Sequence, residues 1–218
     1  PVVLGVQRRD DMAYYNSAVL LGPDAEVVQT YDKHHLVPFG EYIPFGDLLG
    51  RIGLRGMAAQ FGSGFSSGPG ADLMDLGPLG QALPLICYEA VFARDVNASP
   101  ARPAFLMQLT NDAWFGKGQG PLQHLAQARM RAIEQGLPMA RVANTGVSAM
   151  IDPWGRITKS LALNEAGFLD APLPAPLPAT PYSRWGEWPF LFITLAGFAL
   201  VILRRRRNLK FDQRGRQS

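Results

Sequence analysis

Short apolar runs separated by turn signals occupy most of the first 151 residues. Seven of these runs predict β-strands, at residues 2–6, 17–21, 26–33, 82–87, 104–110, 139–143 and 147–151. A helical repeat follows at about residues 121–135, with proline in its first turn and Gly136 directly after its end. Strands of this kind mixed with a helix predict an α/β or α+β sandwich.

The first predicted strand opens the chain. Val2, Val3, Leu4 and Val6 give it the composition of a buried strand, and the residue before them is Pro1 instead of methionine. A domain seldom begins so abruptly. We therefore expect the chain to be part of a longer protein.

A long apolar run near the C-terminus predicts a transmembrane helix at residues 185–203. It contains one charged residue, Glu187, and at 1.5 Å per residue it is just long enough to cross a hydrocarbon core of about 30 Å. Trp185 and Trp188 lie at one end and four consecutive arginines follow the other. Under the positive-inside rule this places the C-terminus in the cytoplasm.

The alternative is a buried amphipathic or core helix. The run disfavours it, because only Thr194 interrupts the apolar residues between Phe190 and Leu203 and no polar face exists. With the tail inside, everything before the helix lies outside the cytoplasm. For a bacterium with an outer membrane, we expect an inner-membrane protein whose folded domain faces the periplasm.

The composition divides the chain into four parts. Residues 1–170 form the expected globular domain, and a proline-rich stretch makes residues 171–184 a linker. Residues 185–203 form the membrane helix and residues 204–218 a basic cytoplasmic tail.

A glycine-rich segment at residues 46–70 also carries large apolar side chains, among them Phe61 and Phe65. It fits equally a mobile flap whose apolar side chains meet lipid and an ordinary long loop packed on the core.

Charge is distributed unevenly along the 218 residues. The net charge of +3 combines seven basic residues and one acid from Arg204 onward with 14 basic and 17 acidic residues before it. Nucleic-acid-binding domains usually carry basic charge over the folded surface, so this pattern argues against nucleic acid. The 47% hydrophobic and 18% charged composition also excludes a disordered chain and a bundle of membrane spans.

The sequence offers no metal-ligand spacing. Cys87 is the single cysteine, His34 and His35 are adjacent, and His124 is distant along the chain. Adjacent residues of a strand point to opposite faces, so the two histidines are expected to be polar residues near a site or the surface.

Cys87 is the candidate nucleophile because it ends an apolar run, and the C-terminal end of a strand is the usual mouth of an α/β site. A reactive thiolate needs a nearby cation, which Lys33 could supply while also binding an oxyanion, and Glu41 could move protons. Taken singly, a lone cysteine is more often a small buried hydrophobe, and a loop lysine or glutamate a solvated charge.

Other residues favour structural roles. We expect Asp112, after a strand, to be a cap or turn residue, and Arg131 and Glu134 to pair with each other on the helix or with neighbouring loops. Trp114 and Phe115 could line an acyl pocket, but core packing is the commoner role for such aromatics.

Several motifs, taken in order, resemble the apolipoprotein N-acyltransferases of the nitrilase superfamily. They are residues 33–42 (KHHLVPFGEY), 86–89 (ICYE), 110–116 (TNDAWFG), 123–132 (QHLAQARMRA), 144–146 (NTG) and the terminal apolar run with its arginines.

The resemblance implies a nitrilase-like αββα sandwich and a Glu-Lys-Cys triad. Lys33 matches the lysine and Cys87 the nucleophile. Glu41 and Glu89 match additional important carboxylates, and Tyr88 the aromatic residue beside the nucleophile. The triad glutamate has no match here, and we expect it upstream.

The implied activity is acyl transfer from a phospholipid donor to the N-terminal α-amine of an apolipoprotein acceptor at the membrane, through a thioester and without a cofactor. Tyr88, Phe61 and Phe65 are the expected substrate-binding residues. Two alternatives stay open: an amidase of the nitrilase type acting on a small C–N substrate, and a non-catalytic, membrane-anchored module.

Overall fold

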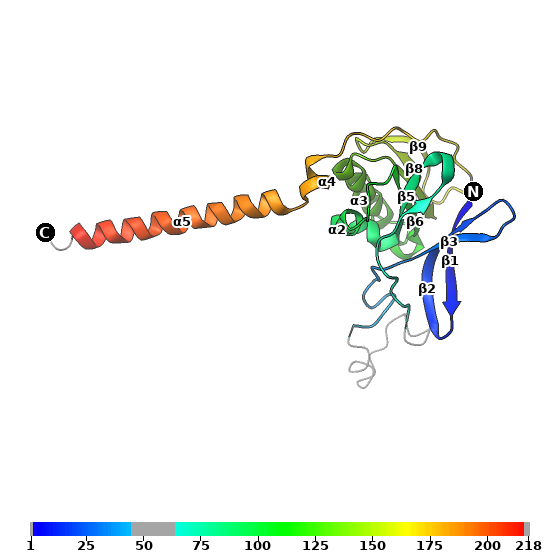
Figure 1. Ribbon diagram of the computed structural model, residues 1–218, viewed down its shortest axis with the longest axis horizontal. Helices are drawn as coiled ribbons and strands as arrows, with labels where there is room; N and C mark the ends of the chain where they lie inside the picture. Colours follow the sequence, from blue (N-terminus) through cyan, green and yellow to red (C-terminus); the bar gives the residue numbers. More distant parts are fainter. Residues whose placement is uncertain (1, 45–63, 216–218) are drawn as a thin grey trace. The chain divides into compact units, whose positions relative to one another are not determined.

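A computed structural model describes residues 2–44 and 64–215 (Figure 1). The chain forms two compact units, Pro1–Thr180 and Pro181–Ser218, which are described separately.

The first unit contains a three-stranded antiparallel sheet made of β1 (Val2–Asp10), β2 (Ala13–Leu21) and β3 (Val27–Asp32). The three strands were predicted, but the expected burial of the first was wrong. β1 is an edge strand, and Val2 and Leu4 are exposed by 55% and 43% because they point away from the core.

A second sheet has six strands in the order of the chain. They are β4 (Met74–Asp75), β5 (Gln81–Ile86), β6 (Phe105–Asn111), β7 (Met139–Asn144), β8 (Ser148–Ile151) and β9 (Ile157–Leu161). β5, β6 and β7 run parallel, and the remaining neighbours are antiparallel. The sequence did not predict β4, which has two residues, or β9, whose side chains are mostly exposed.

Short helices connect these strands, and one long helix covers the sheet. The connectors are η2 (Gly77–Leu79), η3 (Cys87–Val91), α2 (Ala93–Asn97) and η4 (Asp112–Phe115). The long helix α3 (Gly120–Gln135) starts one residue before its predicted position. It ends at Gly136, whose φ of +62° suits glycine and closes the helix.

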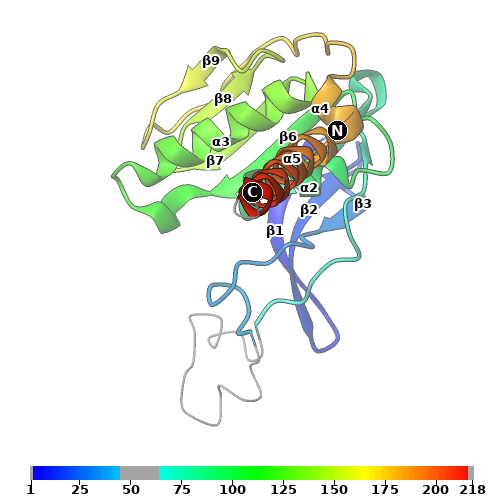
Figure 2. The same ribbon diagram turned by 90° about the vertical axis from the view of Figure 1, so that its left-hand side faces the viewer.

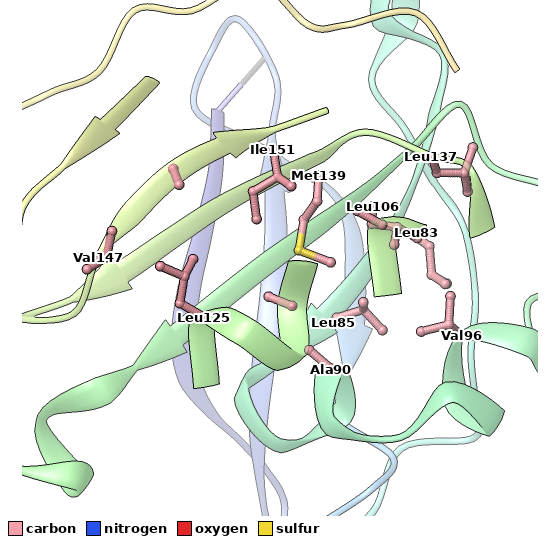
Figure 3. Close-up of a cluster of buried hydrophobic side chains, with 13 residues drawn as sticks. Leu83, Leu85, Ala90, Val96, Leu106, Leu125, Leu137, Met139, Val147 and Ile151 are labelled. Atoms are coloured by element: carbon pink, nitrogen blue, oxygen red, sulfur yellow. The ribbon is translucent and has the colours of Figure 1, made fainter. Parts of the chain in front are cut away.

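Two apolar cores fill the unit. α3 lies across one face of the six-stranded sheet (Figure 2), and its Leu125 shares a buried cluster with Leu106 and Met139 of the sheet (Figure 3). Ala128 and Ala132 of α3 belong to the same cluster. The opposite face of that sheet packs against the three-stranded sheet through a second cluster: Ala18, Leu20, Tyr31, Met74, Leu76, Ala82, Ile86, Phe105 and Met107. The nitrilase-like α/β fold class is therefore confirmed, with helices on one side of the paired sheets among the residues described.

The proline-rich stretch lies partly within the first unit. Leu177 N donates to Gly136 O at 2.9 Å, and Arg102 donates to Leu177 O at 2.9 Å. The Thr180 hydroxyl donates to the carbonyl of Glu134. These bonds hold the stretch beside the end of α3.

The second unit consists of α4 (Pro181–Trp185) and α5 (Trp188–Gly215). The predicted start of the apolar helix at Trp185 was wrong, because Gly186, with a φ of +52°, separates the two helices. α5 also continues through the arginines. Its segment Trp188–Arg205 is long and apolar enough to cross a membrane, and none of it is buried within the protein.

Candidate active site

The C-terminal ends of the parallel strands meet at one edge of the six-stranded sheet. Ile86 pairs with Leu109 and Asn111 pairs with Asn144, so the residues that follow β5, β6 and β7 lie close together. Cys87 is the residue directly after β5. The sheet therefore places the predicted nucleophile at the position where α/β proteins commonly bind ligands.

Cys87 adopts a backbone conformation that is uncommon for a residue with a side chain. It is half-buried, it is the first residue of η3, and its φ is +52°. This left-handed region costs a non-glycine residue about 1–2 kcal/mol. Surrounding interactions must stabilise the turn, and strained residues of this kind cluster at functional sites.

Lys33 and Glu41 form a close ion pair. Lys33 follows β3 and comes two residues after buried Tyr31, so its side chain also points inward and is completely buried. Lys33 Nζ lies 2.7 Å from Glu41 Oε2. Val37 N donates to the same oxygen at 2.8 Å, and Asn16 Nδ2 donates to Glu41 Oε1 at 3.1 Å.

Glu89 is completely buried, and both oxygens of its carboxylate accept hydrogen bonds. Its Oε2 accepts from Ile86 N at 2.7 Å, and its Oε1 accepts from His34 N at 2.8 Å, His35 N at 3.3 Å and the Tyr31 hydroxyl at 3.0 Å. One carboxylate thus joins the loop after Lys33 to the turn of Cys87.

Glu89 also affects the ionisation of its neighbours. Burial and the Glu89 charge raise the pKa of Tyr31 far above its usual range. The hydrogen bond to Glu89 raises the pKa of His34 above its ordinary value, against the opposing effect of burial.

The two adjacent histidines have different partners. His34 Nδ1 lies 2.8 Å from Glu89 Oε1, whereas His35 Nδ1 lies 2.5 Å from Asp95 Oδ2. His35 also stacks on Phe92 with ring centroids 4.4 Å apart and meets the edge of Tyr88 at 5.2 Å. Across residues 2–44 and 64–215, no group of three or more His, Cys, Asp or Glu side chains is placed to hold a metal ion.

The predicted substrate-binding residues are only partly described. Tyr88 is half-buried in the aromatic group with His35 and Phe92. Phe65 N donates to Glu41 O at 2.8 Å, which brings the end of the glycine-rich segment to the Lys33–Glu41 pair. Phe61 lies outside the described residues.

A buried polar network beneath Cys87 was not predicted from the sequence. Four of its members are nearly or completely buried: Gln108, Asp112, His124 and Arg141. Asp112 Oδ2 accepts from Arg141 at 2.6 Å, and its Oδ1 lies 2.9 Å from His124 Nδ1 and 3.0 Å from Thr110 Oγ1. Asp112 is the first residue of η4, in agreement with the expected turn position, but it is not the cap: Asn111 caps η4 by accepting from Ala113 N at 3.2 Å.

Electrostatics inside the network favour a charged pair. Burial alone would raise the pKa of Asp112, but the hydrogen bond with His124 and the charge of Arg141 outweigh it and hold the pKa below its usual value. Burial lowers the pKa of Arg141, and the charge and the hydrogen bond of Asp112 oppose this effect. Gly146 packs so closely that a Cβ there would lie 2.2 Å from Asp112 Oδ2, which accounts for glycine in the Asn144-Thr145-Gly146 motif.

Two further structural expectations had different outcomes. Arg131 pairs with Glu134 at 2.7 Å, as predicted. The prediction that Trp114 and Phe115 pack in the core was wrong. Both lie in η4 after the end of β6, where their side chains are 67% and 44% exposed. The Phe115 ring instead tilts against His124, with centroids 5.2 Å apart.

Known proteins are similar to this chain over most of its length. The chain is 48% identical over 192 residues to the apolipoprotein N-acyltransferase of Rhodopseudomonas palustris, covering 88% of this chain and 36% of that protein. It is 42% identical over 217 residues to the apolipoprotein N-acyltransferase of Sinorhizobium fredii, covering 96% of this chain and 40% of that protein. The chain thus spans well under half the length of these relatives.

Solved structures show the same fold at low identity. A carbon-nitrogen hydrolase from Helicobacter pylori matches with a TM-score of 0.54 at 18% identity, covering 76% of this chain and 59% of the other. An amidase from Nesterenkonia matches with a TM-score of 0.53 at 20% identity, covering 75% of this chain and 57% of the other. The family model for carbon-nitrogen hydrolases matches residues 1–179. The chain therefore belongs to the carbon-nitrogen hydrolase family.

Proposed function

We propose that the chain carries the nucleophile of a membrane-bound apolipoprotein N-acyltransferase. The observation that carries the proposal is the Glu89 bridge, which ties the loop after Lys33 to the turn of Cys87. It joins the segment that carries the buried Lys33–Glu41 pair to the segment that carries the thiol. The relatives named above, at 42–48% identity, support acyl transfer as the reaction.

In the first half of the reaction, the Cys87 thiolate attacks the ester carbonyl carbon of a phospholipid. A C–S bond forms, and the carbonyl oxygen becomes an oxyanion that the Lys33 ammonium and the main-chain N–H of Tyr88 stabilise. Collapse of this intermediate breaks the C–O bond and releases a lysophospholipid, whose alkoxide oxygen takes up a proton. The acyl chain remains on Cys87 as a thioester.

In the second half, the free α-amine of a diacylglyceryl-cysteine at the N-terminus of an apolipoprotein attacks the thioester carbonyl. A C–N bond forms, the C–S bond breaks, and the amine loses a proton. Glu41 is the described carboxylate next to Lys33 and serves in these proton movements. Glu89 acts as a positioning residue, since it is completely buried and joins two main-chain segments, whereas the Glu41 side chain is 14% exposed.

The apolar segment of α5 supports lipid as the source of the acyl group. Its side chains are exposed along a length that matches a bilayer, with Phe190 and Ile193 each 72% exposed. We place the helix in the bacterial inner membrane, the folded unit on its periplasmic side, and Tyr88, Phe61 and Phe65 along the path of the acyl chain.

A transfer assay tests the proposal. The protein, expressed in full from its natural gene, is mixed with vesicles of a phospholipid carrying a fluorescent acyl chain and with a diacylglyceryl-cysteinyl peptide. We expect the acyl chain on the peptide α-amine, and a rate at least about 10³-fold lower for Cys87→Ala. Hydrolysis of small amides without transfer to the peptide would replace the proposal with an amidase.

A further inference from the structure

The carbonyl oxygen of Cys87 lies beside two buried side chains from different elements, one of which donates a hydrogen bond to it. Gln108 Nε2 of β6 donates to it at 3.3 Å, and His124 Nε2 of α3 lies 3.2 Å away. Gln108 Nε2 and His124 Nε2 are themselves 3.1 Å apart. The proposed nucleophile is therefore fixed through its main chain as well as through the Glu89 bridge.

Arg141 sets the orientation of Gln108. The two residues face each other in the register of β6 and β7, and Arg141 Nη1 donates to Gln108 Oε1. An arginine has only donors, so the amide oxygen must point toward it and the amide nitrogen toward Cys87 and His124. Arg141 is 1% exposed and also donates to Val147 O at 3.2 Å, which leaves it little freedom to move.

Asp112 sets the orientation of His124. Its Oδ1 accepts from His124 Nδ1 at 2.9 Å, which leaves Nε2 of the ring as an acceptor for the second amide N–H of Gln108 at 3.1 Å. Asp112 is itself held by Arg141 and Thr110. Gln108, which donates to the Cys87 carbonyl, and His124, which holds Gln108 in place, thus depend on the same buried arginine.

Fixing this carbonyl also fixes the next main-chain N–H. Cis peptide bonds are absent from the described residues, so the C=O of Cys87 and the N–H of Tyr88 point in opposite directions across one planar peptide. η3 begins at Cys87, and the first N–H groups of a helix lack intrahelical acceptors. With its carbonyl turned toward Gln108 and His124, the peptide presents the Tyr88 N–H on the opposite side.

We propose that Gln108 and His124, oriented by Arg141 and Asp112, are positioning residues that hold the peptide after Cys87 in its left-handed turn and aim the Tyr88 N–H at the developing oxyanion. This inference rests on the proposed acyl transfer. It extends that function to four residues that contribute no group to the substrate.

The kinetic test compares Gln108→Leu with a matched control in the full-length protein. Gln135→Leu also removes a buried glutamine, one that donates to Asn97 Oδ1 at 2.6 Å on the same side of the sheet. We expect Gln108→Leu to lower kcat for acyl-enzyme formation by about 10–10²-fold with an unchanged KM for phospholipid, because only the transition state carries the oxyanion. The Gln135→Leu variant keeps its kcat within about twofold.

A second variant guards against misfolding of Gln108→Leu. Gln108→Glu keeps the size of the side chain and an oxygen facing Arg141, but it replaces the donor at the Cys87 carbonyl with an acceptor. The same loss of kcat is expected. Equal kcat values for either Gln108 variant and Gln135→Leu would overturn the proposal.

A substrate-free measurement tests the backbone directly. Because glycine tolerates positive φ, Cys87→Gly should melt about 2–4 °C above Cys87→Ala in the otherwise unchanged protein. If Gln108 holds the turn, the same pair compared in the Gln108→Leu background should differ by less than half as much. An unchanged difference would show that the turn does not depend on this network.

The activity assay and the melting comparison distinguish failure of the proposed function from failure of the proposed role of Gln108. A wild-type protein that transfers no acyl group refutes the proposed function, whereas the melting comparison needs no substrate and still decides whether Gln108 holds the Cys87 turn.

Discussion

Glu89 Oε1 accepts a hydrogen bond from the main-chain N–H of His34 at 2.8 Å, although 55 residues separate the two along the chain. The same carboxylate returns to Ile86 N at 2.7 Å, just before Cys87. Glutamates are rarely buried without partners, and here the partners are two segments that must come together for a site to exist. Glu89 therefore acts as a structural joint between the predicted lysine and the predicted nucleophile.

This joint predicts a large stability effect. Glu89→Ala leaves the N–H groups of Ile86 and His34 without their buried acceptor, at about 1–3 kcal/mol for each group. We expect the free energy of unfolding, measured with urea, to fall by about 3 kcal/mol or more. Glu165→Ala, which removes an exposed carboxylate, is the control and should change it by less than about 0.5 kcal/mol. A similar small change for Glu89→Ala would contradict the structural role.

The Lys33–Glu41 pair predicts coupled effects on stability. Removing either partner leaves the other charge in a buried or half-buried place, which costs about 3–5 kcal/mol for a buried pair. Lys33→Met combined with Glu41→Gln should therefore destabilise the protein by less than the sum of the two single changes.

A measurement of activity distinguishes Lys33→Met from the loss of a surface lysine. Loss of an oxyanion donor lowers kcat by about 10²–10³-fold, which we expect for Lys33→Met. Lys117→Met, at an exposed lysine, is the control and should leave kcat unchanged. If the stability changes of Lys33→Met and Glu41→Gln were additive and Lys33→Met had a normal kcat, Lys33 would have no role in the site.

The first unit shows which elements a sequence can predict. Apolar runs located seven strands, because each of them has a face that enters a core. β9 could not be found in this way, since four of its five residues are exposed. The start of α5 was missed because Gly186 breaks the helix between two tryptophans that look alike in the sequence.

The buried network shows what was missed at the site. Gln108, Asp112, His124 and Arg141 lie up to 33 residues apart, and each looks like a solvated polar residue in its local sequence. Only the parallel register of β6 and β7 brings Gln108 beside Arg141. A hint was available: polar residues alternating into the buried face of a predicted central strand need partners on the neighbouring strand.

His34 predicts a dependence of stability on pH. Its pKa is raised in the folded protein by the hydrogen bond to Glu89. A raised pKa contributes stability that is complete below the unfolded value of about 6.5 and is lost as the pH rises through the folded pKa. We therefore expect the stability advantage of wild type over His34→Gln to shrink as the pH rises from about 6.5.

An NMR titration of the His34 ring checks the sign. The expected midpoint lies above about 6.5. A midpoint below that value, together with an advantage that grows with pH, would mean that the Glu89 charge does not govern His34.

The apolar helix predicts a topology. The segment Trp188–Arg205 ends in arginines, which favour the cytoplasmic side. Green fluorescent protein fused after residue 218 should fluoresce, and alkaline phosphatase at the same position should be inactive. Phosphatase fused after Thr180 is the control and should be active. The opposite pattern would place the folded unit in the cytoplasm and contradict the proposed compartment.

The most direct test of the central claim is the mass of the peptide that contains Cys87 after incubation with phospholipid alone. Cys87 is the only cysteine in the chain, so a thioester has one possible place here. The full-length protein is mixed with vesicles, quenched in acid and digested, with and without neutral hydroxylamine. We predict a mass increase of one acyl chain on the Cys87 peptide that hydroxylamine removes. An acyl adduct on another residue, or acyl transfer that persists in Cys87→Ala, would contradict the claim.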